Sequence, residues 1–173
     1  MIRILQGRPA LASQADEDET EHFDALRKTG FYGKAGAACV VMAKSTGRMR
    51  LPLRSRAVEQ PGTYGVWGGA INPGDNPKTA AMREFEEETG CKQHIEMTPI
   101  YVFRSPTGFV YHNFLAVVPD EFEPKFNWET DKAIWCALNK LPHPLHFGLK
   151  AVIDDPASMA KIRKVADHAS NPS

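Results

Sequence analysis

The sequence predicts an α/β fold in which helices pack on a sheet, and three segments carry that prediction. Residues 35–44 read AGAACVVMAK, an apolar run with β-branched residues at its centre, which is typical of a strand covered on both faces. Residues 97–104 and 110–118 are apolar runs on either side of a Ser-Pro-Thr-Gly turn, which indicates an antiparallel hairpin. Between these strands, capping residues bracket a helix at residues 77–89.

Length and charge limit the classes of function. The chain has 173 residues, which suits one domain, and 42% of them are hydrophobic, which is enough for a core. Lysine and arginine together number 21, as do aspartate and glutamate, so the formal net charge is zero. A neutral chain has no general field that attracts nucleic acid or an anionic membrane. Any site for an anion must therefore be local, and nucleic acid is not expected as a partner.

Composition divides the chain into an extension, a domain and a tail. Residues 1–31 hold a strand-like piece at 2–5 and a short predicted helix within 16–28. They are predicted to form an extension packed on or beside the domain, which takes residues 32–169. Residues 170–173 are predicted to fray. The sequence leaves open whether the extension covers a site, joins a homodimer or extends the sheet.

No segment is predicted to cross a membrane. The longest apolar run, residues 35–43, is far shorter than the roughly 20 residues of a bilayer span, and residues 1–5 lack the apolar stretch of a secretion signal. Cys39, Cys91 and Cys136 show no C-x-x-C spacing, which argues against a zinc site or a disulfide framework. We therefore expect a soluble cytoplasmic protein whose cysteines are small buried hydrophobic residues.

Shorter patterns predict the other elements. Residues 49–54 alternate apolar side chains with Arg50, Pro52 and Arg54, which predicts a half-buried strand with a basic second face. Pro52 cannot donate a ladder hydrogen bond, so an edge or a bulge is expected there. Glycine and proline groups predict a long ordered loop over residues 59–77. A polar loop, a strand and two helices are predicted at residues 119–131, 133–137, 145–154 and 157–168.

The helix predicted at residues 77–89 has the clearest limits. Asn76 is a suitable N-cap, Pro77 suits the first helical position, and Gly90 suits the position after the last turn. At about 100° per residue, one side gathers the residues expected to pack on the sheet, namely Ala81, Met82, Phe85 and Thr89.

Three carboxylates share one arc on the opposite side of this helix. Glu84, Glu87 and Glu88 stand at i, i+3 and i+4, and Ala80 leaves space one turn earlier. These acids repel one another and oppose the helix dipole, and Arg83 alone cannot neutralise all three. A divalent cation could, and oxygen ligands without histidine or cysteine suit Mg²⁺ or Mn²⁺ rather than zinc. The plainer alternative is an acidic helix face that only contacts water.

The same helix belongs to a longer pattern with fixed spacing. Its positions are Gly69, Asp75, Arg83, Glu84, Phe85, Glu87, Glu88, Gly90 and Cys91. This pattern over residues 69–91 resembles the Nudix box, which has glutamate where Asp75 stands. The resemblance implies a Nudix-like α/β/α sandwich around a mixed β-sheet. It also implies Mg²⁺-dependent hydrolysis of a nucleoside diphosphate linked to another moiety.

Residue roles also come from the resemblance. It places the metal ligands at Gly69, Glu84, Glu87 and Glu88, with glycine acting through its backbone carbonyl. Arg83 would orient the glutamates. The general base is either Glu84 or Glu129, which lies in the loop Asn-Trp-Glu-Thr-Asp, and Glu121 and Glu123 are further candidates.

Groups that could bind the substrate precede and follow the box. Arg54 and Arg56 could grip phosphates, because guanidinium binds them bidentately, or they could line a solvated strand edge. Trp67, Phe103 and Tyr111 could stack on a base, although aromatic residues in such a domain are also common in the core.

The preferred function is a pyrophosphatase that acts on a small nucleotide. Nucleoside triphosphates, including oxidised ones, nucleotide sugars and dinucleotides all fit, while RNA 5′ ends are less favoured because the chain carries no excess positive charge. A catalytically weak or inactive Nudix-fold domain that binds nucleotides is the main alternative. It is suggested by Asp75, which is one methylene shorter than glutamate, and by Trp67, which stands where many members have proline. A protein–protein module with a solvated acidic helix is the third reading.

Overall fold

The computed structural model describes residues 35–106 and 108–170. The strand and helix predicted within residues 1–31 lie outside the described residues, as does nearly all of the predicted tail.

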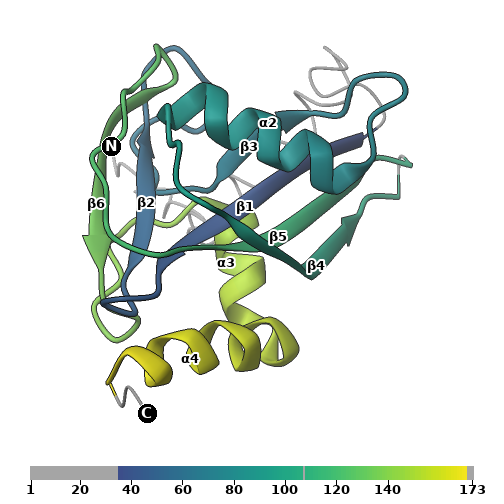
Figure 1. The fold of residues 1–173 in the computed structure, drawn as a ribbon. Coiled ribbons are helices and arrows are strands. Elements are labelled where there is room, and N and C mark those ends of the chain that lie inside the picture. The colour runs from purple at the N-terminus through teal and green to yellow at the C-terminus, as the bar shows by residue number, and fades with distance from the viewer. Residues whose placement is uncertain (1–34, 107, 171–173) are drawn as a thin grey trace, which may run out of the picture.

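A mixed sheet forms the centre of the described chain (Figure 1). Its strands are β1 (Ala35–Ala43), β2 (Met49–Arg54), β3 (Trp67–Ala70), β4 (Glu96–Arg104), β5 (Val110–Val118) and β6 (Thr130–Cys136). The order is β4-β5-β1-β2-β6, with β3 paired to β1. The sheet is mixed because β1 runs parallel to β5 and antiparallel to β2 and β3.

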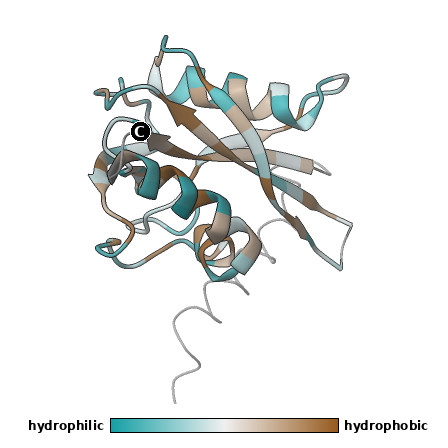
Figure 2. Cartoon of the chain, turned by 60° about the horizontal axis from the view of Figure 1, so that its bottom comes forward, coloured by the Kyte–Doolittle hydropathy of each residue, from teal (hydrophilic) through white to brown (hydrophobic). Residues whose placement is uncertain are grey.

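Helices cover both faces of this sheet, as Figure 1 shows. They are α2 (Pro77–Thr89), α3 (Phe147–Asp154) and α4 (Pro156–Ser170). Alternate residues of β1 enter two cores: Ala37, Cys39 and Val41 pack with α2, whereas Val40 and Met42 pack with α3 and α4. Figure 2 shows hydrophobic colouring along the central strands and hydrophilic residues on the helices. The doubly covered strand and the α/β/α arrangement are therefore confirmed.

Capping holds α2 at its predicted limits. The Asn76 side chain accepts a hydrogen bond from the Thr79 backbone N–H at 2.9 Å. Gly90 adopts the left-handed conformation with φ of 65°, and its N–H donates to the Glu86 carbonyl at 2.8 Å. Both ends of the helix are thus satisfied locally, which explains why neighbouring residues in the sequence were enough to predict them.

The predicted basic face of β2 is not exposed. Arg50 is only 4% exposed, because Trp135 of β6 lies against it with the guanidinium 5.4 Å from the ring centroid, and Glu123 binds it at 3.1 Å. Since β6 pairs along β2, the chain that leads into β6 covers the second face of β2. The bulge expected near Pro52 occurs between Leu53 and Arg54.

The predicted loop at residues 59–77 contains the short strand β3. This strand pairs with residues 36–39 of β1, while β2 pairs with β1 only at residues 41–42, so β3 extends the sheet where β2 has diverged. Gly68 permits the close approach, because a Cβ atom there would lie 2.4 Å from the Ala37 carbonyl oxygen. Two adjacent glycines concealed this strand from a reading based on strand propensity.

The remaining predictions for the domain agree with the structure. The hairpin of β4 and β5 and the two C-terminal helices are confirmed, and the last strand begins earlier than predicted, at Thr130. The three cysteines are free and buried, as expected. Within the described residues, every helix is too short or too polar to cross a bilayer.

Candidate active site

The sheet-facing side of α2 is broader than its pattern indicated. Ala81, Phe85 and Thr89 are buried as predicted. Ala80 is also fully buried in the core, so it does not leave an open space on the acidic side. The reason is that α2 lies over both β1 and β3, which contact a wider arc of the helix than one strand would.

Glu88 points toward β3 rather than toward solvent. It is 7% exposed, and its carboxylate accepts a hydrogen bond from the Gly68 backbone N–H at 3.0 Å. Burial raises the pKa of Glu88 well above its usual range, and the nearby carboxylates of Glu129 and Glu84 raise it further. The Gly68 N–H and the charge of Arg54 act in the opposite direction on this pKa.

Glu84 lies directly over Gly69 of β3. A Cβ atom at Gly69 would lie 2.6 Å from one Glu84 carboxylate oxygen, which is closer than real Cβ contacts come. Any other residue at this position would therefore displace the acid, and this is the physical reason for glycine here. The close contact also brings the backbone of β3 beside the acids of α2.

Arg83 links the first acid of the box to the acids of the helix. Its guanidinium Nη1 donates to Glu84 at 2.5 Å and lies 3.5 Å from Glu87, and its Nε lies 3.6 Å from Asp75. Nη2 donates to the Ala70 carbonyl at 3.1 Å. Burial acts to lower the pKa of Arg83, but its three acidic partners raise it on balance. Arg83 therefore lies between Asp75, Glu84 and Glu87 and contacts all three.

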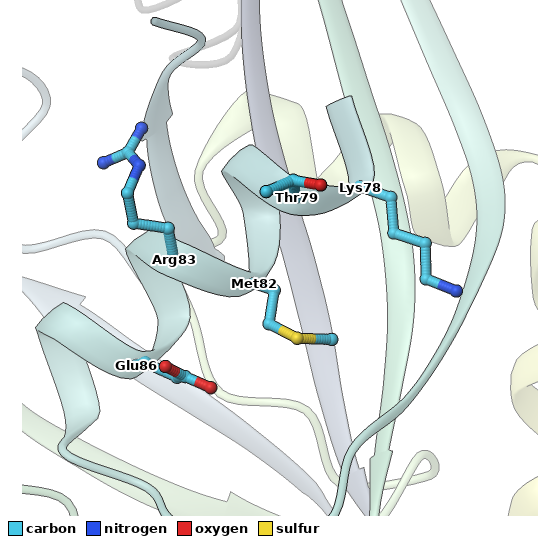
Figure 3. Close-up of a pocket in the computed structure, with 5 residues that line it drawn as sticks. All are labelled: Lys78, Thr79, Met82, Arg83 and Glu86. Carbon is cyan, nitrogen blue, oxygen red and sulfur yellow. The ribbon is translucent and has the colours of Figure 1, made fainter. Parts of the chain in front are cut away.

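The three helix acids do not converge on one point. Glu84 and Glu88 approach β3, whereas the Glu87 side chain is 62% exposed and contacts Arg83 at its far edge. Figure 3 shows Lys78, Thr79, Met82, Arg83 and Glu86, which line a pocket on the same helix, and Arg83 points away from Met82 and Glu86.

Glu129 reaches these acids from a distant part of the chain. The Ser55 backbone N–H donates to the Glu129 carbonyl at 2.9 Å, which fixes the loop before β6 against the end of β2. Burial raises the pKa of Glu129, Arg54 lowers it, and Glu84 raises it. Glu129 therefore joins Glu84 and Glu88 in one acidic cluster.

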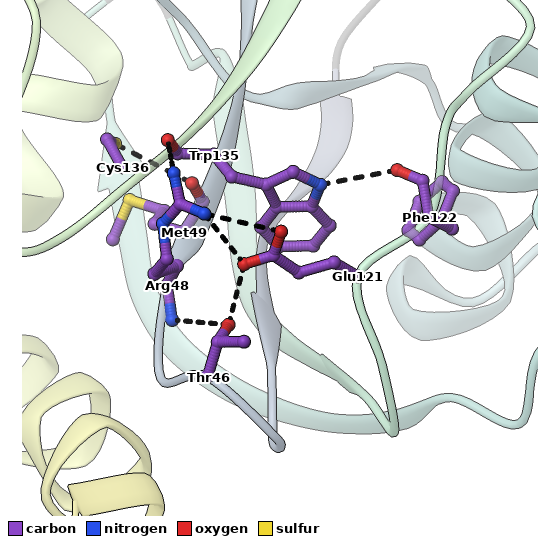
Figure 4. Close-up of polar contacts among 7 residues, drawn as sticks. All are labelled: Thr46, Arg48, Met49, Glu121, Phe122, Trp135 and Cys136. Atoms are coloured by element: carbon purple, nitrogen blue, oxygen red, sulfur yellow. Dashed lines mark hydrogen bonds and ion pairs between the residues drawn. The ribbon is translucent and has the colours of Figure 1, made fainter.

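The other two base candidates are engaged elsewhere. Glu121 binds Arg48 at 3.1 Å, and Figure 4 shows this pair beside the bond from Arg48 to the Trp135 carbonyl. Glu123 binds Arg50. These two ion pairs connect the loop before β6 to Arg48 and Arg50.

Arg54 is a second cation that acts on the acidic cluster, in addition to Arg83. Its Nε donates to the Glu59 carbonyl at 2.7 Å, and its charge lowers the pKa of Glu88 and Glu129. Burial raises the pKa of Glu59, which Arg54 partly offsets. Arg56 is exposed in the turn that follows β2.

The structure contradicts base stacking on Trp67. Its side chain is 1% exposed, its ring meets Phe85 edge-on at 6.5 Å, and its Nε1 donates to the Arg50 carbonyl at 3.4 Å. Trp67 is a core residue because its side chain, on β3, packs against Phe85 of α2. Phe103 packs edge-on against Phe147 at 6.4 Å on the other face of the sheet.

Sequence reasoning missed two residues beside the acids. Ser55 holds the backbone of the loop that carries Glu129, and Trp128 is exposed next to Glu129. Trp128 stands in the same short polar motif as Glu129, which was a usable signal. No sequence signal identified Ser55, because its role depends on the pairing of β2 with β6.

The donor chemistry of the acidic cluster fits a hard divalent cation. Within residues 35–106 and 108–170, no group of three or more acidic, histidine or cysteine side chains is arranged so that it could hold a metal ion. However, the charge of Glu84 raises the pKa of both Glu88 and Glu129, and the Glu84 carboxylate lies over Gly69 of β3. Carboxylate and carbonyl oxygens are the ligands that Mg²⁺ and Mn²⁺ prefer.

Known proteins resemble the chain in sequence and in fold. A model of the NUDIX domain family matches residues 33–155. A Mycobacterium tuberculosis protein named "Putative 8-oxo-dGTP diphosphatase 3" is 27% identical over 154 residues, which cover 83% of this chain and 71% of that protein. The crystal structure of the MutT NUDIX hydrolase from Burkholderia pseudomallei is 25% identical, with a TM-score of 0.52, and the match covers 76% of this chain and 97% of that one.

A further solved structure is similar in fold alone. The NUDIX domain of Shewanella oneidensis NrtR, complexed with ADP ribose, is 18% identical with a TM-score of 0.60, and the match covers 84% of this chain and 98% of that one. The family match spans well over half of the sequence and includes the whole acidic helix with the strand beneath it. The chain therefore belongs to the Nudix family.

Proposed function

We propose that the protein is a divalent-metal-dependent hydrolase that cleaves the pyrophosphate bond of a nucleoside diphosphate linked to another moiety. The observation that carries the proposal is the acidic cluster of Glu84, Glu88 and Glu129, assembled from two distant segments beside the glycine backbone of β3. A partly buried cluster of like charges is unfavourable alone, and a cation bound there would stabilise it.

The metal would be Mg²⁺ or Mn²⁺, held by Glu84, Glu87, Glu88 and the Gly69 carbonyl. When bound, such an ion would neutralise charge on the diphosphate and make a coordinated water more acidic. Glu87 is exposed and lies at the edge of the Arg83 contact, so its side chain is free to turn toward an ion. Arg83 holds Glu84 in place through the short hydrogen bond and is itself fixed by the Ala70 carbonyl.

We assign the general base to Glu129. A base must be able to accept a proton, and the Glu84 carboxylate already accepts the short hydrogen bond from Arg83. Glu129 is held through its backbone by Ser55, which leaves its carboxylate available to orient and deprotonate a water. Arg54 lies within the same cluster and would bind a phosphate oxygen of the substrate.

The substrate is a small nucleotide: a nucleoside triphosphate, a nucleotide sugar or a dinucleotide. The name of the Mycobacterium tuberculosis relative favours an oxidised deoxynucleoside triphosphate, and the ligand of the NrtR domain favours a nucleotide sugar. A panel should therefore contain dGTP, 8-oxo-dGTP, ADP ribose and a diadenosine polyphosphate.

Hydrolysis of this panel with and without Mg²⁺ tests the proposal. We expect Mg²⁺-dependent release of a nucleotide product, and we expect Glu88→Gln to lower kcat/KM by at least about a hundredfold, roughly 2.7 kcal/mol. Glu86→Gln is the matched control, since Glu86 is exposed on the same helix and points away from Arg83 (Figure 3). Equal activity in Glu88→Gln and Glu86→Gln would contradict the proposed site.

A nucleotide-binding domain without turnover is the second candidate function. Asp75 favours it, because the shorter acid is committed to Arg83 at 3.6 Å. Nucleotide binding by the wild-type chain without hydrolysis of any member of the panel would support this alternative.

A further inference from the structure

Trp128 is an aromatic side chain exposed beside the acidic cluster. It is 64% exposed, compared with 43% for Phe126 and 41% for Val102, the other large hydrophobic residues exposed in the described chain. The residue that follows it is Glu129, and consecutive Cα atoms are about 3.8 Å apart. The indole ring therefore starts within one residue of a carboxylate that interacts with Glu84 and Glu88.

The backbone around Trp128 is fixed by hydrogen bonds. The Ser55 Oγ donates to the Trp128 carbonyl at 2.7 Å, and the Ser55 N–H donates to the Glu129 carbonyl at 2.9 Å. The Asn127 side chain accepts from the Glu129 N–H at 3.0 Å. Ser55 itself is buried. An aromatic side chain on a fixed backbone loses less conformational freedom when it binds a ligand than one on a loose loop.

We infer that Trp128 is the platform on which the base of the nucleotide stacks. The inference rests on the proposed function, because a divalent ion held by the acidic cluster is taken to bind the diphosphate. In such a substrate the base is joined to the phosphates through a single sugar, so it must lie a short distance from the cluster. Trp128 supplies an exposed aromatic face at that place, whereas Trp67 is enclosed in the core.

Stacking explains the position of Trp128 better than packing does. The other two tryptophans, Trp67 and Trp135, are 1% and 9% exposed and pack in the core. Every base presents a flat aromatic face, so stacking tolerates different bases and does not fix the identity of the nucleotide. Phe126 is exposed in the same loop but lies two residues farther from Glu129 along the chain.

The test compares a ligand that has a base with one that has none. ADP and GDP are the probes with a base, and inorganic pyrophosphate is the probe without one, all in the presence of Mg²⁺. Because the other two tryptophans are buried, quenching of tryptophan fluorescence by ADP or GDP reports on Trp128. Calorimetry gives affinities for variants that lack the fluorophore.

We expect Trp128→Ala to weaken ADP or GDP binding by roughly 5-fold to 150-fold, the range of stacking losses on alanine substitution. Pyrophosphate affinity should stay within about twofold of wild type, and Trp128→Phe should retain most of the nucleotide affinity, because phenylalanine keeps an aromatic face. Phe126→Ala is the matched control and should bind both probes like the wild type.

Three results would overturn the inference. The first is an unchanged affinity of Trp128→Ala for ADP or GDP. The second is a loss of pyrophosphate affinity in Trp128→Ala as large as its loss of nucleotide affinity, which would indicate a distorted loop. The third is a loss of nucleotide affinity in Phe126→Ala as large as that in Trp128→Ala. The panel of substrates separates this inference from the proposed function. If Trp128→Ala hydrolyses the panel as the wild type does, the stacking role is wrong and the proposed enzyme stands. If binding depends on Trp128 but the wild type hydrolyses no member of the panel, the proposed enzyme is wrong and the stacking role stands. If the wild type neither binds ADP or GDP nor hydrolyses any member of the panel, both proposals are wrong.

Discussion

Gly69 and Glu84 depend on each other more closely than any other pair of residues in the site. The Glu84 carboxylate occupies the space where a side chain at residue 69 would begin. Arg83 also holds this carboxylate through a hydrogen bond at 2.5 Å. Glycine at residue 69 therefore makes room for the Glu84 carboxylate, and no turn requires it, since Gly69 lies within strand β3.

Gly69→Ala should damage activity more than stability. The added methyl group meets the far end of an acidic side chain, which can rotate away without moving the backbone. We expect kcat/KM for the best substrate of the panel to fall by at least about tenfold, roughly 1.4 kcal/mol, with little change in the midpoint of urea unfolding. Gly65→Ala is the control, because a Cβ atom there meets only ordinary contacts at 3.6 Å. Full activity in Gly69→Ala would show that Glu84 does not need its present position.

At the scale of elements, the second helical layer is attached to the sheet through the start of α4. The Asp155 carboxylate accepts a hydrogen bond from the Ser158 N–H at 2.8 Å, as an N-cap does, and lies 2.6 Å from the Ser158 hydroxyl. That hydroxyl is also 2.9 Å from the Ile100 carbonyl of β4. The side-chain and backbone hydrogen bonds from Ser158 lower the pKa of Asp155.

This arrangement predicts a pH-dependent contribution to stability. Because the pKa of Asp155 is lower in the folded chain than in the unfolded chain, its contribution is present above the unfolded value and is lost as the pH falls through the folded value. Asp155→Ala should therefore lower the midpoint of urea unfolding at pH 7, and the difference from wild type should shrink below about pH 4. Asp154→Ala is the control, since Asp154 is exposed and paired only with Lys150 among the described residues. A difference that stays constant down to pH 2 would exclude the capping carboxylate as its source.

At the scale of the whole molecule, the site exists because two distant segments meet. The acids of α2 come from residues 84–88, and Glu129 comes from the loop before β6, which the pairing of β6 with β2 brings to the end of β2. Two ion pairs, from Arg48 to Glu121 and from Arg50 to Glu123, hold the beginning of this loop (Figure 4 shows the first).

Glu129→Gln and Glu84→Gln should therefore fail in different ways. We expect Glu129→Gln to lower kcat by roughly 10² to 10⁴ while the concentration of Mg²⁺ that gives half-maximal rate changes little, because the base is removed and the ligands stay. Glu84→Gln should raise that Mg²⁺ concentration, because a ligand is removed. Glu86→Gln is the control, since Glu86 is exposed on α2 and points away from Arg83, and it should keep its rate (Figure 3). If Glu84→Gln lowers kcat at saturating Mg²⁺ and Glu129→Gln does not, the base is Glu84; if neither loses more than about tenfold, neither is the base.

The sequence by itself determined the parts of this protein that depend on near neighbours. The limits of α2 follow from Asn76 and Gly90, and the burial of β1 on both faces follows from its continuous apolar run. The family and the acids of the box followed from spacing within residues 69–91. These features depend on contacts within a few residues or on a fixed linear pattern, and one sequence is enough to recognise them.

Only the tertiary structure decided which polar residues are buried and which distant residues meet. Arg50 and Trp67 looked suited to solvent or substrate, but the pairing of β6 with β2 and of β3 with β1 encloses them. The same pairings bring Glu129 to the acids of α2 and leave Trp128 exposed beside them. The physical reason is that burial depends on the segments that cover a residue, and those segments lie far away along the chain.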